Sequence, residues 1–469
     1  MEENLGFNDY LDQDPTPYIS RFEEMLKQKT EYFFDVEEFE NIIDHYLVTS
    51  KFKIASMAAE IGCMQHPDAT AIKLRKAQVL ASLNKPQKAL QFLNDIEATE
   101  PGNPDIHIVK GNIFSQLKDH KKAIKQYLLA IDKADQLDDV YMYLAFEYQN
   151  IGDSKKAIAY FTKTLKEDPE NEVALYELVF CFESLGKMKE STNFYKSFLD
   201  AYPYNQAAWY NLGISYTKLG LNEHAIDAFE FAIAIDPSLS SALFNKAHSL
   251  SNMGQYDKAI TAFQDTFQHE EPEAYTYYFI GECYEKMGDH VTAIENYQNA
   301  LKIEPDLADA WLSIGMVLNK KDQTKEGISH IKKAIDLDPD NSIYWQVYGN
   351  VLEQTGLQHA ALNAYKESID IEPDNFSARL NYTDLLFEID KKESAIMEIE
   401  EGIKKFPECA DLRYRLTAYL LSSGNQNHAY EQFSHGLKLD YEKHKDLFDF
   451  LPQSRKNTAI IDLIASFEK

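Results

Sequence analysis

The chain has 469 residues, and its 47 Lys and Arg against 76 Asp and Glu give a formal net charge of −29. Such a charge argues against binding to nucleic acid or to anionic lipid, because both need a cationic surface, and it favours attraction to basic partners. With 44% hydrophobic residues, the composition is that of a folded, acidic protein.

The N-terminal segment, residues 1–35, is predicted to form a cap. Residues 1–14 are acidic and contain no apolar run, so we expect no secretory signal there. A helix is predicted over residues 16–30, with one apolar face made of Tyr18, Ile19, Phe22, Met25 and Leu26. A solubilising cap explains this pattern, and a docking peptide for a partner is the alternative.

From residue 36 to residue 443 the chain keeps a period of 34 residues without insertion or deletion. Nine of the fifteen prolines share one position of that period: Pro67, Pro101, Pro169, Pro203, Pro237, Pro305, Pro339, Pro373 and Pro407. Twelve units fill this range, and they begin at residues 36, 70, 104, 138, 172, 206, 240, 274, 308, 342, 376 and 410. Such a period indicates tandem repeats rather than separate globular domains.

Each unit contains the pattern of two helices. In the sixth unit the helical spacing marks one apolar face on each, made of Trp209, Leu212, Gly213 and Tyr216 and then of Ala225, Ile226, Phe229 and Ala232. Gly220 between them suits a turn with positive φ, and Pro237 ends the unit. Gly213 and Ala225 are small where the two helices are predicted to cross, and Phe229 is expected to fill the space beside them.

Residues 444–469 are predicted to close the array with a capping helix. Pro452 breaks the chain, and the helix is expected from about Ser454. Its inward side chains are predicted to be Ile460, Ile461, Leu463, Ile464 and Phe467.

The pattern W-x2-LG-x2-Y, followed by small, aromatic and small residues and then proline, resembles the tetratricopeptide repeat at its period of 34. The segments that carry it most clearly are Trp209 to Gly213, Trp311 to Gly315 and Ala293 to Pro305. The resemblance implies an all-α fold, an α-solenoid superhelix of tandem antiparallel helix-turn-helix repeats. It also implies an inner surface lined by positions 2, 5, 6, 9, 12 and 13 of each unit, which lie on its first helix. Position 1 is the first residue of a unit, so position 5 of the sixth unit is Tyr210.

Units four to eight place aromatic and asparagine side chains at these inner positions. The candidate peptide-binding groove consists of Tyr143, Phe146, Tyr176, Phe180, Tyr210, Asn211, Phe244, Asn245, Tyr278 and Phe279. Aromatic rings bury a large area with few rotatable bonds, and asparagine both donates to and accepts from a peptide backbone. This combination favours an extended peptide or a helix lying in a groove, whereas packing between repeats is the alternative for the same rings.

Acidic residues accompany the candidate aromatics. Glu177, Glu183, Glu282 and Glu285 lie beside them in the sequence. A ligand with apolar anchors flanked by Lys or Arg is therefore predicted. Position 5 carries no lysine in any unit, which disfavours the carboxylate clamp by which some tetratricopeptide proteins hold a chaperone C-terminus.

No motif for catalysis, metal binding or cofactor binding is present. The chain lacks HExxH, GxxxxGK[ST] and GxSxG, and it has no GxGxxG before a helix. Its four cysteines are far apart in the sequence and form no CxxC pair, so reduced thiols in a cytoplasm are the simpler interpretation. Cys181 and Cys283 share position 10, where packing is expected. We therefore expect no enzyme, no metal and no cofactor.

These observations predict a non-enzymatic cytoplasmic scaffold or adaptor that binds peptide or protein segments in the groove. The net charge of −29 leads us to expect no nucleic-acid partner and no contact with anionic membranes, and no stretch approaches about 18 consecutive apolar residues, the length that a spanning helix needs. Two alternatives stay open: a regulatory or substrate-presenting subunit of a separately encoded enzyme, and an assembly or chaperone-like factor. The oligomeric state stays open as well.

Overall fold

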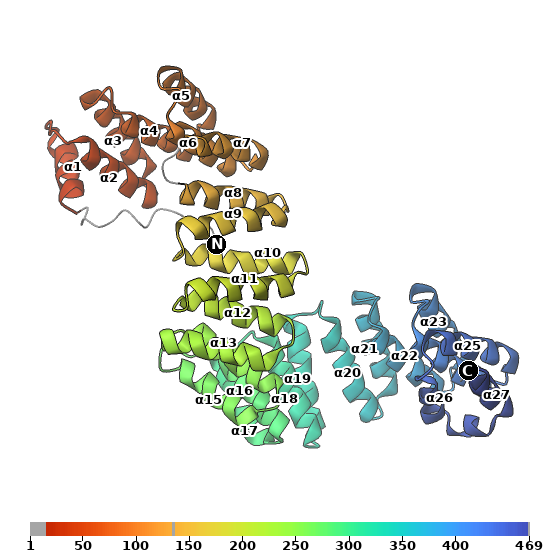
Figure 1. Ribbon diagram of the computed structural model, residues 1–469. Coiled ribbons are helices and arrows are strands. Elements are labelled where there is room, and N and C mark those ends of the chain that lie inside the picture. The colour runs from red at the N-terminus through yellow and green to blue at the C-terminus, as the bar shows by residue number, and fades with distance from the viewer. Residues whose placement is uncertain (1–15, 134–136, 468–469) are drawn as a thin grey trace. The chain divides into compact units, whose positions relative to one another are not determined.

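The computed structural model describes residues 16–133 and 137–467, and every regular element in these ranges is a helix. The predicted acidic segment 1–14 lies outside the described residues. The chain divides into two units, residues 1–249 and 250–469. Within each unit the helices follow one another as consecutive hairpins (Figure 1). The predicted all-α solenoid fold is confirmed.

The first unit contains a leading helix followed by helix pairs. The leading helix is α1 (Thr16–Gln28), and α14 (Ser240–Asn252) crosses the boundary to the second unit. The pairs are α2 (Val36–Val48) with α3 (Phe52–Gln65), α4 (Thr70–Ser82) with α5 (Pro86–Thr99), α6 (Pro104–Gln116) with α7 (His120–Ile131), α8 (Asp138–Asn150) with α9 (Ser154–Glu167), α10 (Glu172–Ser184) with α11 (Met188–Ala201), and α12 (Gln206–Lys218) with α13 (Asn222–Ile235).

The second unit begins with α15 (Tyr256–Thr266) and ends with short elements. Its pairs are α16 (Ala274–Met287) with α17 (His290–Ile303), α18 (Ala308–Lys320) with α19 (Thr324–Leu337), α20 (Ser342–Gln354) with α21 (Gln358–Ile371), α22 (Phe376–Glu388) with α23 (Lys392–Lys405), and α24 (Ala410–Ser422) with α25 (Gln426–Leu439). Then come α26 (His444–Phe450), a 3-10 helix over Pro452–Lys456 and α27 (Thr458–Phe467).

Several of the first helices begin after a polar residue that caps them. Asn171 and Asn205 accept hydrogen bonds from the backbone N–H groups of Ala174 and Ala208, at 3.0 and 2.8 Å. Asn103, Asn341 and Asn375 cap their helices in the same way. Each cap satisfies a donor that the first turn of a helix leaves unpaired.

Position 15 of each repeat is a left-handed turn between the two helices. The seven glycines there, such as Gly152 and Gly220, have φ between 66° and 82°, as the sequence predicted. The five repeats without glycine adopt positive φ at the same position with Ser50, Asn84, Lys118, Asp322 and Asp390. Every repeat therefore requires the left-handed backbone conformation at this position, and glycine is the residue that adopts it without steric cost.

Exchanging glycine and lysine at this turn should change the free energy of unfolding in opposite directions. Lys118 has φ 58° and Gly152 has φ 77°. We expect Lys118→Gly to raise the free energy of unfolding by up to about 1 kcal/mol and Gly152→Lys to lower it by about 1–2 kcal/mol. Urea unfolding followed by circular dichroism measures both. Equal effects of the same sign would contradict the turn as the cause.

Small and aromatic side chains set the crossing of the two helices in each repeat. Position 20 is buried in all twelve repeats, and the position-24 ring Phe229 is 0% exposed. A Cβ atom on Gly213 would lie 2.5 Å from Cε1 of Phe229, so glycine is required for this approach. The predicted crossing of Gly213, Ala225 and Phe229 is confirmed. The core runs continuously from α7 to α14 through such contacts.

The loop between repeats is held by the position-4 side chain. The indole Nε1 groups of Trp209, Trp311 and Trp345 donate to the carbonyl oxygens of Pro203, Pro305 and Pro339, at 2.8, 2.9 and 2.9 Å. Arg413 donates to the carbonyl of Pro407 at the same position of the last repeat. The tryptophan of the repeat pattern therefore satisfies a loop acceptor as well as packing.

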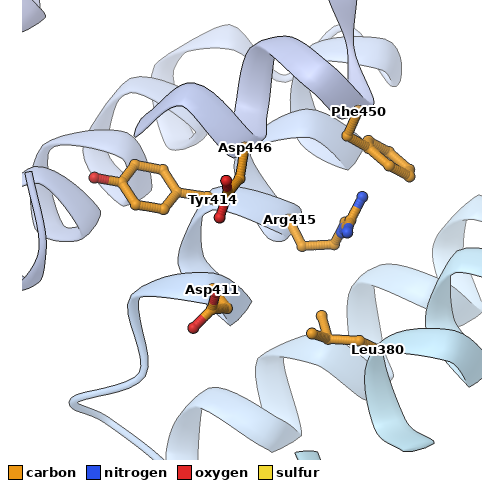
Figure 2. Close-up of a pocket in the computed structure, with 6 residues that line it drawn as sticks. All are labelled: Leu380, Asp411, Tyr414, Arg415, Asp446 and Phe450. Carbon is orange, nitrogen blue, oxygen red and sulfur yellow. The ribbon is translucent and has the colours of Figure 1, made fainter. Parts of the chain in front are cut away.

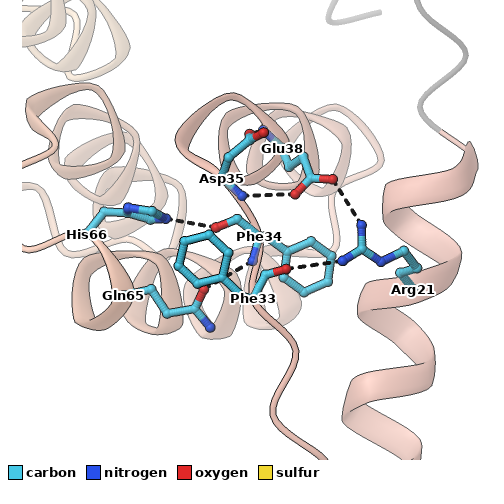
Figure 3. Close-up of polar contacts among 7 residues, drawn as sticks. All are labelled: Arg21, Phe33, Phe34, Asp35, Glu38, Gln65 and His66. Atoms are coloured by element: carbon cyan, nitrogen blue, oxygen red, sulfur yellow. Dashed lines mark hydrogen bonds and ion pairs between the residues drawn. The ribbon is translucent and has the colours of Figure 1, made fainter.

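Helix α1 docks on the first repeat through the segment that precedes α2. Arg21 donates to Glu38 and to the carbonyl of Phe33, at 3.0 and 3.1 Å (Figure 3). His66 Nε2 lies 2.8 Å from the carbonyl oxygen of Phe34. Phe22 of α1 is fully buried. The apolar face predicted for this helix therefore packs against the array.

The C-terminal segment differs from the prediction of one capping helix from about Ser454. Residues 452–456 form a 3-10 helix, and α27 begins at Thr458 because Asn457 Oδ1 accepts from the backbone N–H groups of Ala459 and Ile460. Ile460 is buried, but Ile461 is 47% exposed rather than inward. The other predicted inward side chains, Leu463, Ile464 and Phe467, pack partly buried against the same cluster as Ile460, which leaves Ile461 on the outer side of α27.

Candidate functional site

The candidate residues lie on the first helices of consecutive repeats, and in the first unit they form one connected surface. The ring centroids of Tyr176 on α10 and Tyr210 on α12 are 5.8 Å apart. Asn245 Nδ2 on α14 donates to the hydroxyl of Tyr210 at 3.2 Å. Gln149 on α8 donates to Glu177 on α10 at 2.6 Å. We call the exposed side of α8, α10, α12 and α14 the first-helix surface.

Most of the candidate rings contact buried aromatic side chains of the core. Tyr143 lies 5.4 Å from Tyr127, and Phe146 meets Phe161 edge-on at 5.4 Å. Tyr210 lies 5.8 Å from Phe229. The candidate rings Tyr143, Phe146, Tyr176, Tyr210 and Phe244 are half-buried. They thus take part in packing and still present an edge to the outside.

Phe180 is the exception among the candidates. Its side chain is 60% exposed on α10, and no ring contact is recorded for it within the described residues. A ring with this exposure contributes little to the core, whereas burial by a ligand would remove a large apolar area from water. Phe180 is therefore the candidate aromatic residue with the most ring surface open to solvent.

The two candidate asparagines differ, and one prediction is wrong. Asn211 is 2% exposed, and its Nδ2 donates to the carbonyl of Ala207 one turn earlier, so it is not available to a peptide. Asn245 makes the same bond to Ser241 but is half-buried and also reaches Tyr210. In α12 the side chain at position 6 faces the interior of the array. The helical spacing of the sequence alone could not show that the same position is buried in one repeat and half-buried in another.

Two titratable side chains of this surface, Tyr176 and His248, are uncharged near pH 7. Burial, followed by the charge of Glu172, raises the pKa of Tyr176 to about 12. Burial also lowers the pKa of His248, at position 9 of α14, to about 4. Both groups therefore keep one fixed protonation state near neutral pH and can serve as constant hydrogen-bonding groups.

Tyr278 and Phe279 lie in the second unit and form a cluster of their own. Phe279 stacks on Phe263 with centroids 6.0 Å apart, and Tyr278 lies 5.5 Å from Tyr297. The Tyr278 hydroxyl donates to Glu282 at 3.3 Å. Tyr275, which the sequence analysis did not select, is 44% exposed beside them.

The predicted acidic rim is largely paired. Lys218 Nζ lies 2.6 Å from Glu183, and Lys320 Nζ lies 2.7 Å from Glu285. Each pair joins residues 35 apart, from position 12 of one first helix to position 13 of the next. This spacing was visible in the sequence and would have identified the pairs. Two of the four predicted rim carboxylates are thus paired with lysine, whereas Glu177 and Glu282 accept hydrogen bonds from the uncharged groups of Gln149 and Tyr278.

The chain covers its own first-helix positions in the last two repeats, which the sequence analysis missed. Figure 2 shows Arg415 of α24 pointing towards Phe450 of α26, with Leu380 of α22 beside it. The Arg415 Cζ atom lies 3.9 Å from the Phe450 ring centroid. Asp384 lies 3.3 Å from Nε of Arg415. A small pocket of about 50 Å³ is left here.

Asp384 should titrate well above an ordinary aspartate. Burial raises its pKa to about 6, although Arg415 and a hydrogen bond from Tyr419 act in the opposite direction. Because folding favours the protonated form, this contribution to stability is complete below about pH 4 and is lost as the pH rises through 6. Carboxyl ¹³C NMR, with Asp384→Asn for assignment, should give a midpoint near 6. A midpoint near 4 would contradict this arrangement.

The remaining chemistry-bearing side chains are dispersed. Cys181 and Cys283 are each 1% exposed, in agreement with packing, and burial raises the pKa of Cys181 to about 11. Within residues 16–133 and 137–467, no group of three or more His, Cys, Asp or Glu side chains is placed to hold a metal ion. None of the helices in the described ranges combines the length and apolar character needed to span a bilayer.

Three solved structures illustrate the similarity to known folds. Yeast Tom70 matches with a TM-score of 0.48 and 12% identity, over 90% of this chain and 95% of its own. Cut9–Hcn1 of the APC/C matches with a TM-score of 0.41 and 16% identity, over 86% and 93%. A tetratricopeptide repeat protein from Parabacteroides merdae matches with 0.44 and 14%, over 53% and 98%. A comparison with curated proteins finds no significant match.

Three family models, each described as tetratricopeptide repeat, match the sequence itself. One matches residues 240–396, a second residues 207–239, and a third residues 104–132 and 138–171. Together they cover more than half of the chain, and they fall on the helix pairs and left-handed turns described above. The chain therefore belongs to the tetratricopeptide repeat family.

Proposed function

We propose that the chain is a non-enzymatic adaptor whose first-helix surface in residues 138–245 binds an extended or helical segment of a partner protein, in the cytoplasm. Tetratricopeptide repeats generally bind protein or peptide partners and are generally not catalysts. The observation that carries the proposal is Phe180, which is 60% exposed on a surface joined from α8 to α14.

The surface suggests the chemistry of the ligand. An apolar anchor would cover Phe180 and remove its ring from water. The amide of Asn245 and the protonated hydroxyl of Tyr176 offer polar partners to the ligand backbone. Because Glu183 is already paired with Lys218, basic flanking residues should contribute less to affinity than the apolar anchor.

The test removes the exposed ring without disturbing the fold. Position 9, where Phe180 lies, carries asparagine in two other repeats, as Asn112 and Asn350, so Phe180→Asn should fold. Met397→Gln on α23 is the matched control, because Met397 is 70% exposed in the second unit. Tagged chains are used to purify partners from the host, and the partners are quantified by mass spectrometry.

We expect Phe180→Asn to lose at least about tenfold of a specific partner, the equivalent of one well-buried anchor ring. The Met397→Gln variant should retain that partner. Equal recovery by the wild type and Phe180→Asn, with superimposable circular dichroism spectra, would overturn the proposal.

A further inference from the structure

Exposed aromatic side chains also gather away from the first-helix surface, at one inter-repeat turn and the following second helix. Tyr202 and Tyr204 lie in the turn between α11 and α12, and Phe231 lies on α13. Their exposures are 38%, 84% and 54%, and Tyr204 has the highest value among the large hydrophobic residues. Together with Trp209, which joins them, we call these residues the aromatic patch.

The repeat register shows that folding does not require these rings. Position 33, occupied by Tyr204, carries aspartate in other repeats, as at Asp68, Asp306, Asp340 and Asp374. Position 26, occupied by Phe231, is polar in nine of the other eleven repeats, as at Asp95, Ser197 and Asn299. Position 31, occupied by Tyr202, is Asp168 in the preceding repeat and Asp236 in the next. Three aromatic residues thus depart from a largely polar pattern, two of them in one turn and the third on the helix that packs against Trp209 after that turn.

Trp209 connects the turn to α13. Its ring stacks on Phe231 with centroids 4.4 Å apart and an interplanar angle of 21°. Its Nε1 donates to the carbonyl oxygen of Pro203, the residue between the two tyrosines. The patch is therefore rigid on one side, while the outer faces of Phe231 and Tyr204 remain open to solvent.

The charges around the patch favour a basic partner. Asp200 precedes Tyr202 by two residues, Asp227 lies one helical turn before Phe231, and both are exposed. The chain also provides an internal example of the same contact. At position 26 of repeat four, Lys163 Nζ lies 5.2 Å from the ring centroid of the position-4 residue Tyr141. A cation is thus accommodated where Phe231 lies in repeat six.

We propose that the aromatic patch is a second interaction surface, which binds a segment of a partner protein through arginine or lysine side chains. The cationic groups stack on Phe231 and Tyr204 and approach Asp200 and Asp227. A second copy of this chain is a poorer occupant, because two molecules of net charge −29 repel each other.

The probe is a fluorescein-labelled Arg-Leu-Arg-Leu-Arg-Leu peptide, and the matched peptide has citrulline in place of arginine. The patch variant is Tyr204→Asp with Phe231→Asn, which uses side chains that the array carries at the same positions. Tyr204→Asp alone serves if the double variant does not fold. Met397→Gln on α23 is the control variant, and Phe180→Asn reports any binding of the peptide to the first-helix surface. Fluorescence anisotropy gives the affinities.

We expect the wild type and Met397→Gln to bind the arginine peptide about tenfold more tightly than the citrulline peptide, and the patch variant to lose that tenfold. Tyr204→Asp adds negative charge. If net charge alone attracted the arginine peptide, the patch variant would bind it as tightly as the wild type or more tightly, and this result would overturn the proposal. Loss of binding only in Phe180→Asn would also overturn it. Concentration-dependent dimers in sedimentation, absent from the patch variant, would assign the patch to a second copy instead.

Discussion

Replacing Phe229 by alanine is expected to lower the free energy of unfolding by about 3–5 kcal/mol, among the largest effects of any single truncation in the first unit. Phe229 is 0% exposed, and its ring fills the space left by Gly213 on the facing helix. Its removal leaves a cavity between α12 and α13 that the two helix backbones cannot close without losing their other contacts.

Urea unfolding measures this loss, and amide hydrogen exchange locates it in repeat six and its neighbours, since repeat stability is carried by nearest-neighbour interfaces. The matched control is Phe231→Ala on the same helix. Phe231 is 54% exposed and should cost less than about 1 kcal/mol. Similar losses for the two variants would contradict the assignment of Phe229 to the core.

The substitution Gly327→Ala is expected to destabilise the second unit by about 1–3 kcal/mol, against the trend of the repeat pattern. Position 20 is alanine in ten of the twelve repeats, and alanine favours a helix over glycine by about 1 kcal/mol. Sequence reasoning alone would therefore predict stabilisation. In repeat nine, however, a Cβ atom on Gly327 would lie 2.7 Å from the carbonyl oxygen of Gly315.

A backbone carbonyl in a helix cannot rotate away as a side chain can, so α18 and α19 would have to separate. Gly102→Ala is the control, because a Cβ atom there has no neighbour within 4 Å and Gly102 does not have a positive φ. Thermal unfolding of both variants decides the sign. A melting temperature of Gly327→Ala at or above that of the wild type would contradict the close approach.

The repeat geometry could be predicted from the sequence because the same steric demand recurs. Gly220 and its equivalents mark a left-handed turn, and Gly213 with Phe229 marks a helix crossing, so each position was observed several times in one chain. Gly327 is a position where the residue shared by most repeats does not predict the local geometry. One repeat brings its two backbones closer than the others, and only the coordinates identify it.

The candidate site was less predictable, because exposure depends on packing between repeats rather than on helical phase. Asn211 and Asn245 occupy the same position, yet one is buried and the other half-buried. The covering of the last two repeats by α26 depends on a contact between Phe450 and Arg415, which no period in the sequence encodes. The pairs Lys218–Glu183 and Lys320–Glu285, by contrast, follow a spacing that could have been used.

The left-handed turn at position 15 also bears on how such a chain can change in length. All twelve turns have the same backbone hand, whether or not the residue is glycine. The two helices of every repeat are therefore joined by the same kind of turn. A gain or loss of 34 residues adds or removes one helix pair together with its turn, whereas a gain or loss of a few residues disrupts the pair and its contacts with both neighbours. The array is in this sense a modular design, in which the number of repeats can vary while the geometry of each joint stays constant.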